Sequence, residues 1–151
     1  MRRLKILVIN FILLFILTSC ARNIYMYKFP YESKDVIKME IYNLEDEISC
    51  DKIGRFSDIE PAKVIDSKDY ETLMQEVEEI PFQLVVLLIA SAPSPENGFD
   101  GYVLYVEYKN GEKSIISNRL RLDYKTDGQC SGDYYGYSES FNELMERYIN
   151  N

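Results

Sequence analysis

The chain has 151 residues, a length that fits one ordinary domain, and its 25 acidic and 17 basic residues give a formal net charge of −8. A surface this acidic repels phosphate backbones, which argues against nucleic-acid binding, so a charged partner is expected to be basic. The chain contains no histidine, and this excludes Ser-His-Asp and Cys-His catalysis and the zinc sites that need imidazole.

The amino terminus has the pattern of an export signal. Arg2, Arg3 and Lys5 make a positively charged start, and residues 6–17 are apolar except for Asn10. This apolar run is shorter than the about 20 residues that a membrane-spanning helix needs. The pattern therefore predicts an exported chain rather than one held by a transmembrane helix.

The apolar run ends in Leu17-Thr18-Ser19-Cys20. These four residues resemble the lipobox of bacterial lipoprotein precursors. The resemblance implies that residues 1–19 are a signal peptide and that Cys20 carries a diacylglyceryl group, with acyl chains such as palmitate, as the first residue of the mature chain. The alternative is an ordinary signal peptide followed by a chance cysteine.

A lipidated Cys20 would anchor the protein in the cell membrane, because two acyl chains are enough for stable anchoring. Since the chain is expected to be exported, the domain would lie on the outward face. Whether that membrane is an inner or an outer one stays open. Loss of the three signal-peptide cations changes the net charge to −8 − 3 = −11. This acidity predicts that the domain stands off anionic lipid head groups.

Two cysteines remain in the mature chain, Cys50 and Cys130. In an exported protein an even pair is compatible with a disulfide, and two separate buried thiols are the alternative. Two cysteines without histidine are too few for a metal site. No metal site, cofactor or catalytic residue is predicted.

Residues 20–33 are expected to form the lipidated amino terminus and a tether. The aromatic residues of this segment alternate as they do in a strand, but Pro30 argues against a central strand. The segment could dock on the domain, lie at the lipid interface or contact a partner. The alternating residues are Tyr25, Tyr27, Phe29 and Tyr31.

Residues 34–151 are expected to form a single domain that begins with a strand in which Ile37, Met39 and Ile41 face inward. A loop over 43–62 precedes a helix that starts near Asp66-Ser67 and stops at Pro81. Its apolar stripe has the i, i+3, i+4, i+7 spacing of an amphipathic helix. The stripe consists of Tyr70, Leu73, Met74, Val77 and Ile80.

The second half of the domain is expected to be a meander of strands followed by a helix. Residues 82–90 are nearly all apolar and predict a central strand, and residues 91–98 predict a loop. Asn110-Gly111 predicts a two-residue type I′ turn between strands 102–108 and 113–117, with Val106 opposite Ile115.

A further one-sided strand is predicted around Leu120, Leu122 and Tyr124, followed by a turn at Asp127-Gly128 and a short strand over 134–137. The last helix opens at Ser138. Its apolar stripe consists of Phe141, Leu144, Met145, Tyr148 and Ile149.

This order of elements predicts an α+β fold: one mainly antiparallel sheet of about five strands, with two amphipathic helices packed on one face. In element order and export signal the chain resembles small uncharacterised lipoprotein domains of low-GC Gram-positive bacteria. That resemblance brings no known active residues with it.

Two classes of function follow. The first is a non-catalytic, membrane-anchored domain that binds a protein, peptide or glycan partner, and the thirteen tyrosines would suit such an interface. Tyrosines that simply pack on a half-buried sheet are the alternative. The second class is a small exported hydrolase that uses a pair of carboxylates.

The face of the sheet without helices is the expected partner surface. The two-residue turn would place Val103, Tyr105 and Ile116 together on that face, beside Arg119 and Arg121. An exposed apolar centre with a charged rim is typical of partner sites. The competing interpretation is that the aromatic tether folds back and covers this cluster.

Overall fold

The structure, a computed structural model, describes residues 24–44, 56, 58–83, 101–118, 120–134 and 138–151. Residues 84–90 of the predicted strand over 82–90, the predicted loop over 91–98, Cys20, Cys50 and Arg119 lie outside these residues. The described strands and helices are β1 (Ile24–Met26), β2 (Val36–Leu44), β3 (Lys63–Val64), α2 (Tyr70–Glu78), β4 (Pro81–Gln83), β5 (Gly101–Tyr108), β6 (Lys113–Ser117), β7 (Leu120–Tyr124), β8 (Cys130–Tyr134) and α3 (Glu139–Asn150).

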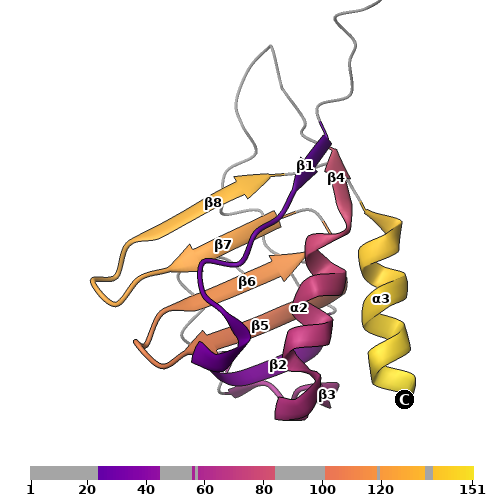
Figure 1. The fold of residues 1–151 in the computed structure, drawn as a ribbon, viewed down its shortest axis with the longest axis horizontal. Coiled ribbons are helices and arrows are strands. Elements are labelled where there is room, and N and C mark those ends of the chain that lie inside the picture. Colours follow the sequence, from indigo (N-terminus) through magenta and orange to yellow (C-terminus); the bar gives the residue numbers. More distant parts are fainter. Residues whose placement is uncertain (1–23, 45–55, 57, 84–100, 119, 135–137) are drawn as a thin grey trace, which may run out of the picture.

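The main sheet has the strand order β3-β2-β5-β6-β7-β8, and every neighbouring pair is antiparallel. The strands β1 and β4 form a separate antiparallel pair (Figure 1). The α+β class and the antiparallel sheet are confirmed. The two-residue strand β3 extends the sheet beyond the five strands expected from the sequence.

Both helices have the apolar stripes that their sequence spacing predicts. Asp66 caps the 3-10 turn at Ser67–Asp69 by accepting a hydrogen bond from the backbone N–H of Lys68, and this turn leads into α2. The helix ends before Pro81, which continues into β4. Within the described residues, no helix combines the length and apolar character that spanning a membrane requires.

One hydrophobic cluster contains side chains from both helices and from one side of the sheet. Leu73 and Val77 of α2 and Phe141 and Met145 of α3 are buried in it. Burial of these side chains contributes about 1.5–3 kcal/mol each. The strand members of this cluster are Val36, Met39, Ile41, Leu104, Val106, Tyr108 and Ile116.

A second cluster occupies the other side of the sheet, because neighbouring residues along a strand point to opposite faces. Phe56 and the half-buried Ile59, which belong to the connection between β2 and β3, contribute to it. The expectation that this side is open is therefore wrong at its centre. The strand members of the second cluster are Tyr42, Leu44, Val103, Tyr105, Ile115 and Leu122.

The turn between β5 and β6 differs from the predicted type I′ turn by one residue. The backbone N–H of Tyr108 donates to the carbonyl of Glu112, so the loop spans Lys109 to Gly111, and Gly111 has φ +83°. This is the three-residue loop in which a type I turn is followed by a left-handed glycine. Ile115 consequently pairs with Tyr105 instead of Val106.

A bulge changes the pattern at the start of β2. The register shifts between Val36 and Lys38, so Val36 is buried and Ile37 is 54% exposed. The predicted inward positions are correct for Met39 and Ile41 and wrong for Ile37. The extra residue of a bulge explains the difference, because it breaks the strict two-residue period.

The amino-terminal segment is part of the fold from residue 24 onward, and we call residues 24–31 the strap. It begins with β1, which pairs with β4, and Tyr27 is then completely buried in the first cluster. Phe29 and Tyr31 also pack against this cluster. Of the three interpretations of the aromatic segment, docking is the one that the structure shows.

The strap is held by contacts along its length. The guanidinium of Arg121 in β7 lies 4.6 Å from the centre of the Tyr27 ring. The backbone N–H of Phe29 donates to Glu78 of α2 over 3.0 Å, and the Tyr31 hydroxyl donates to Glu112 over 2.7 Å. The strap therefore connects the sheet to α2 and lies across β7, β6 and β5 in Figure 1.

The strand predicted around Leu120, Leu122 and Tyr124 is confirmed as β7, whereas the last strand, β8, is displaced along the sequence from its expected position. β8 spans Cys130–Tyr134, whereas the short strand was expected at 134–137, a range whose last three residues lie outside the described part. The turn at Asp127-Gly128 is confirmed, with Gly128 at φ +83°. It repeats the three-residue loop of the β5–β6 hairpin, because Lys125 N–H donates to the carbonyl of Gln129.

Candidate functional site

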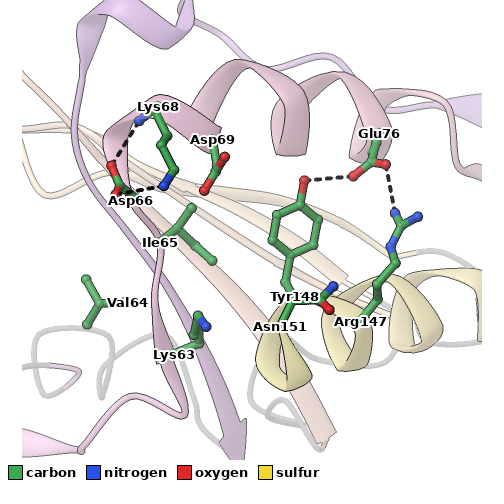
Figure 2. A pocket seen from close by; sticks show the side chains of 10 residues that line it. All are labelled: Lys63, Val64, Ile65, Asp66, Lys68, Asp69, Glu76, Arg147, Tyr148 and Asn151. Carbon is green, nitrogen blue, oxygen red and sulfur yellow. Dashed lines mark hydrogen bonds and ion pairs between the residues drawn. The ribbon is translucent and has the colours of Figure 1, made fainter.

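A polar hollow of about 440 Å³ lies where β3 and the start of α2 meet the end of α3 (Figure 2). Its walls are formed by two parts of the chain that are far apart in the sequence, residues 63–76 and 147–151. The lining residues are Lys63, Val64, Ile65, Asp66, Lys68, Asp69, Glu76, Arg147, Tyr148 and Asn151.

Glu76 connects the two helices on one side of the hollow. Its carboxylate accepts a hydrogen bond from the Tyr148 hydroxyl and another from the Arg147 guanidinium, each over 2.8 Å. Burial, together with the hydrogen bond to Glu76, raises the pKa of Tyr148 to about 12. The tyrosine therefore remains a neutral hydrogen-bond donor at physiological pH.

Asp66 and Lys68 form the opposite rim, as Figure 2 shows. Asp66 accepts a hydrogen bond from the backbone N–H of Lys68, and the Lys68 ammonium lies 3.4 Å from its carboxylate. The backbone N–H and then the ammonium hold the pKa of Asp66 below its usual value. A general acid needs a raised pKa, so the shift at Asp66 is opposite to the one that glycoside hydrolysis requires of its acid.

The charges around the hollow balance. The lining includes three cationic and three anionic side chains, so their formal charges sum to zero. Val64 adds an apolar side chain on the rim that is 60% exposed. Such a lining can donate to and accept from a polar ligand without favouring a strongly charged one. The cations are Lys63, Lys68 and Arg147, and the anions are Asp66, Asp69 and Glu76.

The expected partner surface is not formed, because its apolar members are buried on two different sides of the sheet. Val103 and Tyr105 belong to the second cluster and are 0% and 4% exposed. Ile116 belongs to the first cluster and is 1% exposed. Arg121 lies against Tyr27 and pairs with Asp123, on the same side as Ile116. The expected exposed cluster is therefore wrong.

Tyr105 lies among charged side chains that contact its ring or accept hydrogen bonds from the neighbouring tyrosines. The ammonium groups of Lys38 and Lys113 lie 5.9 and 5.7 Å from the centre of its ring. Its hydroxyl donates to Glu107, and the neighbouring buried Glu40 accepts from Tyr42 over 2.6 Å. These tyrosines pack on the sheet, which is the alternative interpretation of the tyrosine content.

The described residues do not test the pairing of Cys50 with Cys130. Cys130 is the first residue of β8, and Cys50 lies outside the described residues. The disulfide therefore stays a prediction. Among the residues with described side chains, no group of three or more cysteine and carboxylate side chains gathers to hold a metal ion.

Sequence reasoning missed the hollow because its residues carry no local motif. The helical spacing places Glu76 outside the apolar stripe of its helix, and Tyr148 belongs to the apolar stripe of the last helix. Glu76 and Arg147 are 71 residues apart and meet only once both helices have packed. Their types and spacing carry no signal that could have predicted this pair.

Comparison with protein-family models, with characterised proteins and with solved structures found no match for this chain.

Proposed function

We propose that this chain is a lipid-anchored protein of the cell envelope whose outward-facing domain binds a protein, peptide or glycan partner without catalysis. The anchor is supported by the charged start, the apolar run over 6–17 and the sequence Leu17-Thr18-Ser19-Cys20. The single structural observation that carries the binding role is the charge-balanced hollow between α2 and α3.

The chemistry of the hollow favours a polar partner of low net charge. Its carboxylates at Asp66 and Glu76 are already hydrogen-bonded, and Arg147 is paired with Glu76. A strongly charged ligand would have to break these pairs, whereas peptide amides or sugar hydroxyls can add further hydrogen bonds to them. The basic partner expected from net charge alone is therefore not the partner that this hollow favours.

The binding role can be tested with a photo-reactive amino acid in the full-length protein in cells. Val64 lines the hollow and is 60% exposed, and Ile37 is 54% exposed and does not line it, so Ile37 is the matched control. We expect a covalent adduct from position 64 that position 37 does not give. The adduct should weaken when Arg147→Ala is added to the chain.

Adducts of equal pattern and yield from both positions would contradict binding at the hollow. An adduct from position 64 that persists in full after both Arg147→Ala and Lys63→Ala would also contradict it. These substitutions alter half-exposed or exposed side chains, and Arg147 is 56% exposed in its ion pair. The fold should therefore tolerate them, since exposed ion pairs contribute only about 0–1 kcal/mol.

A further inference from the structure

We infer that the lipid anchor holds the domain with its β1–β4 end against the membrane, so that the hollow between α2 and α3 faces away from it. This inference rests on the proposed lipidation of Cys20. It goes further by assigning a lipid-facing end and a partner-facing end to the domain.

The first observation is the short distance along the chain between the anchor and the fold. Ile24, the first residue of β1, is four residues after Cys20. An extended chain spans at most about 3.3–3.6 Å per residue, so Ile24 lies within roughly 14 Å of the lipidated residue. The anchor therefore keeps Ile24 close to the membrane surface, within a distance smaller than the about 30 Å thickness of the hydrocarbon core.

The second observation is that the strap cannot supply more length without loss of core contacts. β1 is paired with β4 over Ile24↔Gln83, Tyr25↔Phe82 and Met26↔Pro81. Tyr27 then enters the core and has no exposed surface. Freeing the strap would expose that ring and break the contacts of Phe29 and Tyr31, which costs several kcal/mol. The attached end is therefore fixed.

The third observation is that this end lies beside the start of α3 and the hollow beside its end, although Glu76 and Arg147 line both the hollow and the recess at Pro81. Pro81, the partner of Met26, lines one recess together with Ser140 in the first turn of α3. Tyr148 and Asn151 at the other end of α3 line the polar hollow. With a rise of 1.5 Å per residue, the eight residues from Ser140 to Tyr148 separate these two positions by about 12 Å along α3. Figure 1 shows β1 and the carboxyl terminus at opposite ends.

The proposed orientation limits one expectation from composition. The acidity of the chain predicts that the domain stands off the bilayer, but the anchor leaves about 14 Å of chain for doing so. Repulsion between the domain and anionic lipids is screened beyond about 8–10 Å at physiological ionic strength. The acidic surface therefore limits how closely the rest of the domain approaches the membrane. The anchor still holds the β1–β4 end in place.

The orientation can be measured on the mature full-length protein in nanodiscs of phosphatidylcholine that contain a lipid with a nitroxide on its head group. The nitroxide broadens amide NMR signals, and the loss of signal intensity increases as the distance between the amide and the nitroxide decreases. We expect the greatest loss at residues 24–26, 82, 83 and 139–140, and the smallest at residues 63–69 and 147–151. Phosphatidylcholine is zwitterionic, so surface charge does not determine the result.

A matched variant tests the role of chain length. Insertion of 12 Gly and Ser residues after Asn23 adds a flexible linker with a root-mean-square length of about 20 Å. The signal loss at the β1–β4 end should then fall, and the difference between the two ends should shrink. The wild-type protein and this variant carry the same anchor.

The outcomes separate the inference from the proposed function. Mass spectrometry of the same sample shows whether Cys20 is lipidated, and an unmodified Cys20 would overturn both the anchor and the orientation. A lipidated Cys20 with equal signal loss at both ends, or with greater loss at the hollow, would overturn the orientation alone. Unchanged signal loss after linker insertion would show that the chain length does not set the orientation.

Discussion

Tyr27 is expected to contribute more to stability than the exposed contacts of the strap. Its side chain is completely buried, and Arg121 lies over the ring at 4.6 Å. Replacing a buried aromatic side chain by alanine costs about 3–5 kcal/mol, and the contact with Arg121 is part of that loss. With a urea slope of 1–3 kcal/mol per molar, Tyr27→Ala should lower the urea midpoint by roughly 2 M.

Lys28→Ala is the matched control in the same segment. The Lys28 ammonium pairs with Glu78 over 2.6 Å, but its side chain is 71% exposed, so the expected loss is about 0–1 kcal/mol. Urea unfolding followed by circular dichroism compares the two variants in a Cys20→Ser background without residues 1–19. Equal midpoints for Tyr27→Ala and Lys28→Ala would refute the burial of the strap.

Tyr27→Phe separates the ring from its hydroxyl. The hydroxyl is buried and has no hydrogen-bond partner within the described residues, although Ser114 lies close to it. A buried hydroxyl without a partner costs about 1–3 kcal/mol, so its removal should leave stability unchanged or increase it. A loss of more than about 1 kcal/mol in Tyr27→Phe would show that the hydroxyl is hydrogen-bonded in solution.

Further predictions concern the turn, alkaline pH and the bulge. Gly111→Val should lower the free energy of unfolding by at least about 1 kcal/mol, because φ is +83° and an added Cβ would lie 3.3 Å from Thr126. Gly111→Asn should lower it less, and thermal melting distinguishes the two variants. Burial raises the pKa values of Tyr42, Tyr105 and Tyr108 above 10.0, so their contribution to stability should be complete below pH 10 and decrease as the pH rises above it. Urea unfolding between pH 8 and 12 measures this, and a flat profile would contradict the burial of these rings. Ile37→Ser should change stability by less than about 0.5 kcal/mol, since Ile37 is 54% exposed, whereas Ile41→Ser should cost several.

The elements that the sequence predicted well are those fixed by nearby residues. The stripes of both helices depend on spacings of three and four residues, and Pro81 ends α2 through its own backbone geometry. The strands β5, β6 and β7 follow from alternation over five to eight residues. Local patterns of this kind also determine the fold class.

Register was harder to predict, because Asn110-Gly111 is compatible with loops of two and of three residues. A shift of one residue moves every side chain of a strand to the other face. The error therefore exchanged Ile115 and Ile116, and it assembled an exposed cluster from side chains that are buried on opposite sides. The bulge after Val36 had the same effect on Ile37.

The strap and the hollow depend on contacts between distant parts of the chain. Alternating aromatic residues fit both a tether and a docked segment, and contacts with distant residues, such as that of Tyr27 with Arg121, distinguish the two. The hollow forms when Lys63, Glu76 and Tyr148 come together from three elements. No spacing within the sequence encodes that meeting.

The most direct test of the lipid anchor is the mass of the amino-terminal peptide of the protein extracted from membranes. We expect residues 1–19 to be absent and Cys20 to be the first residue, with a diacylglyceryl group on its sulfur. Cys20→Ser should abolish that modification and release the protein from the membrane fraction. An unmodified Cys20 in the membrane-bound protein, or an unchanged membrane yield of Cys20→Ser, would contradict the anchor.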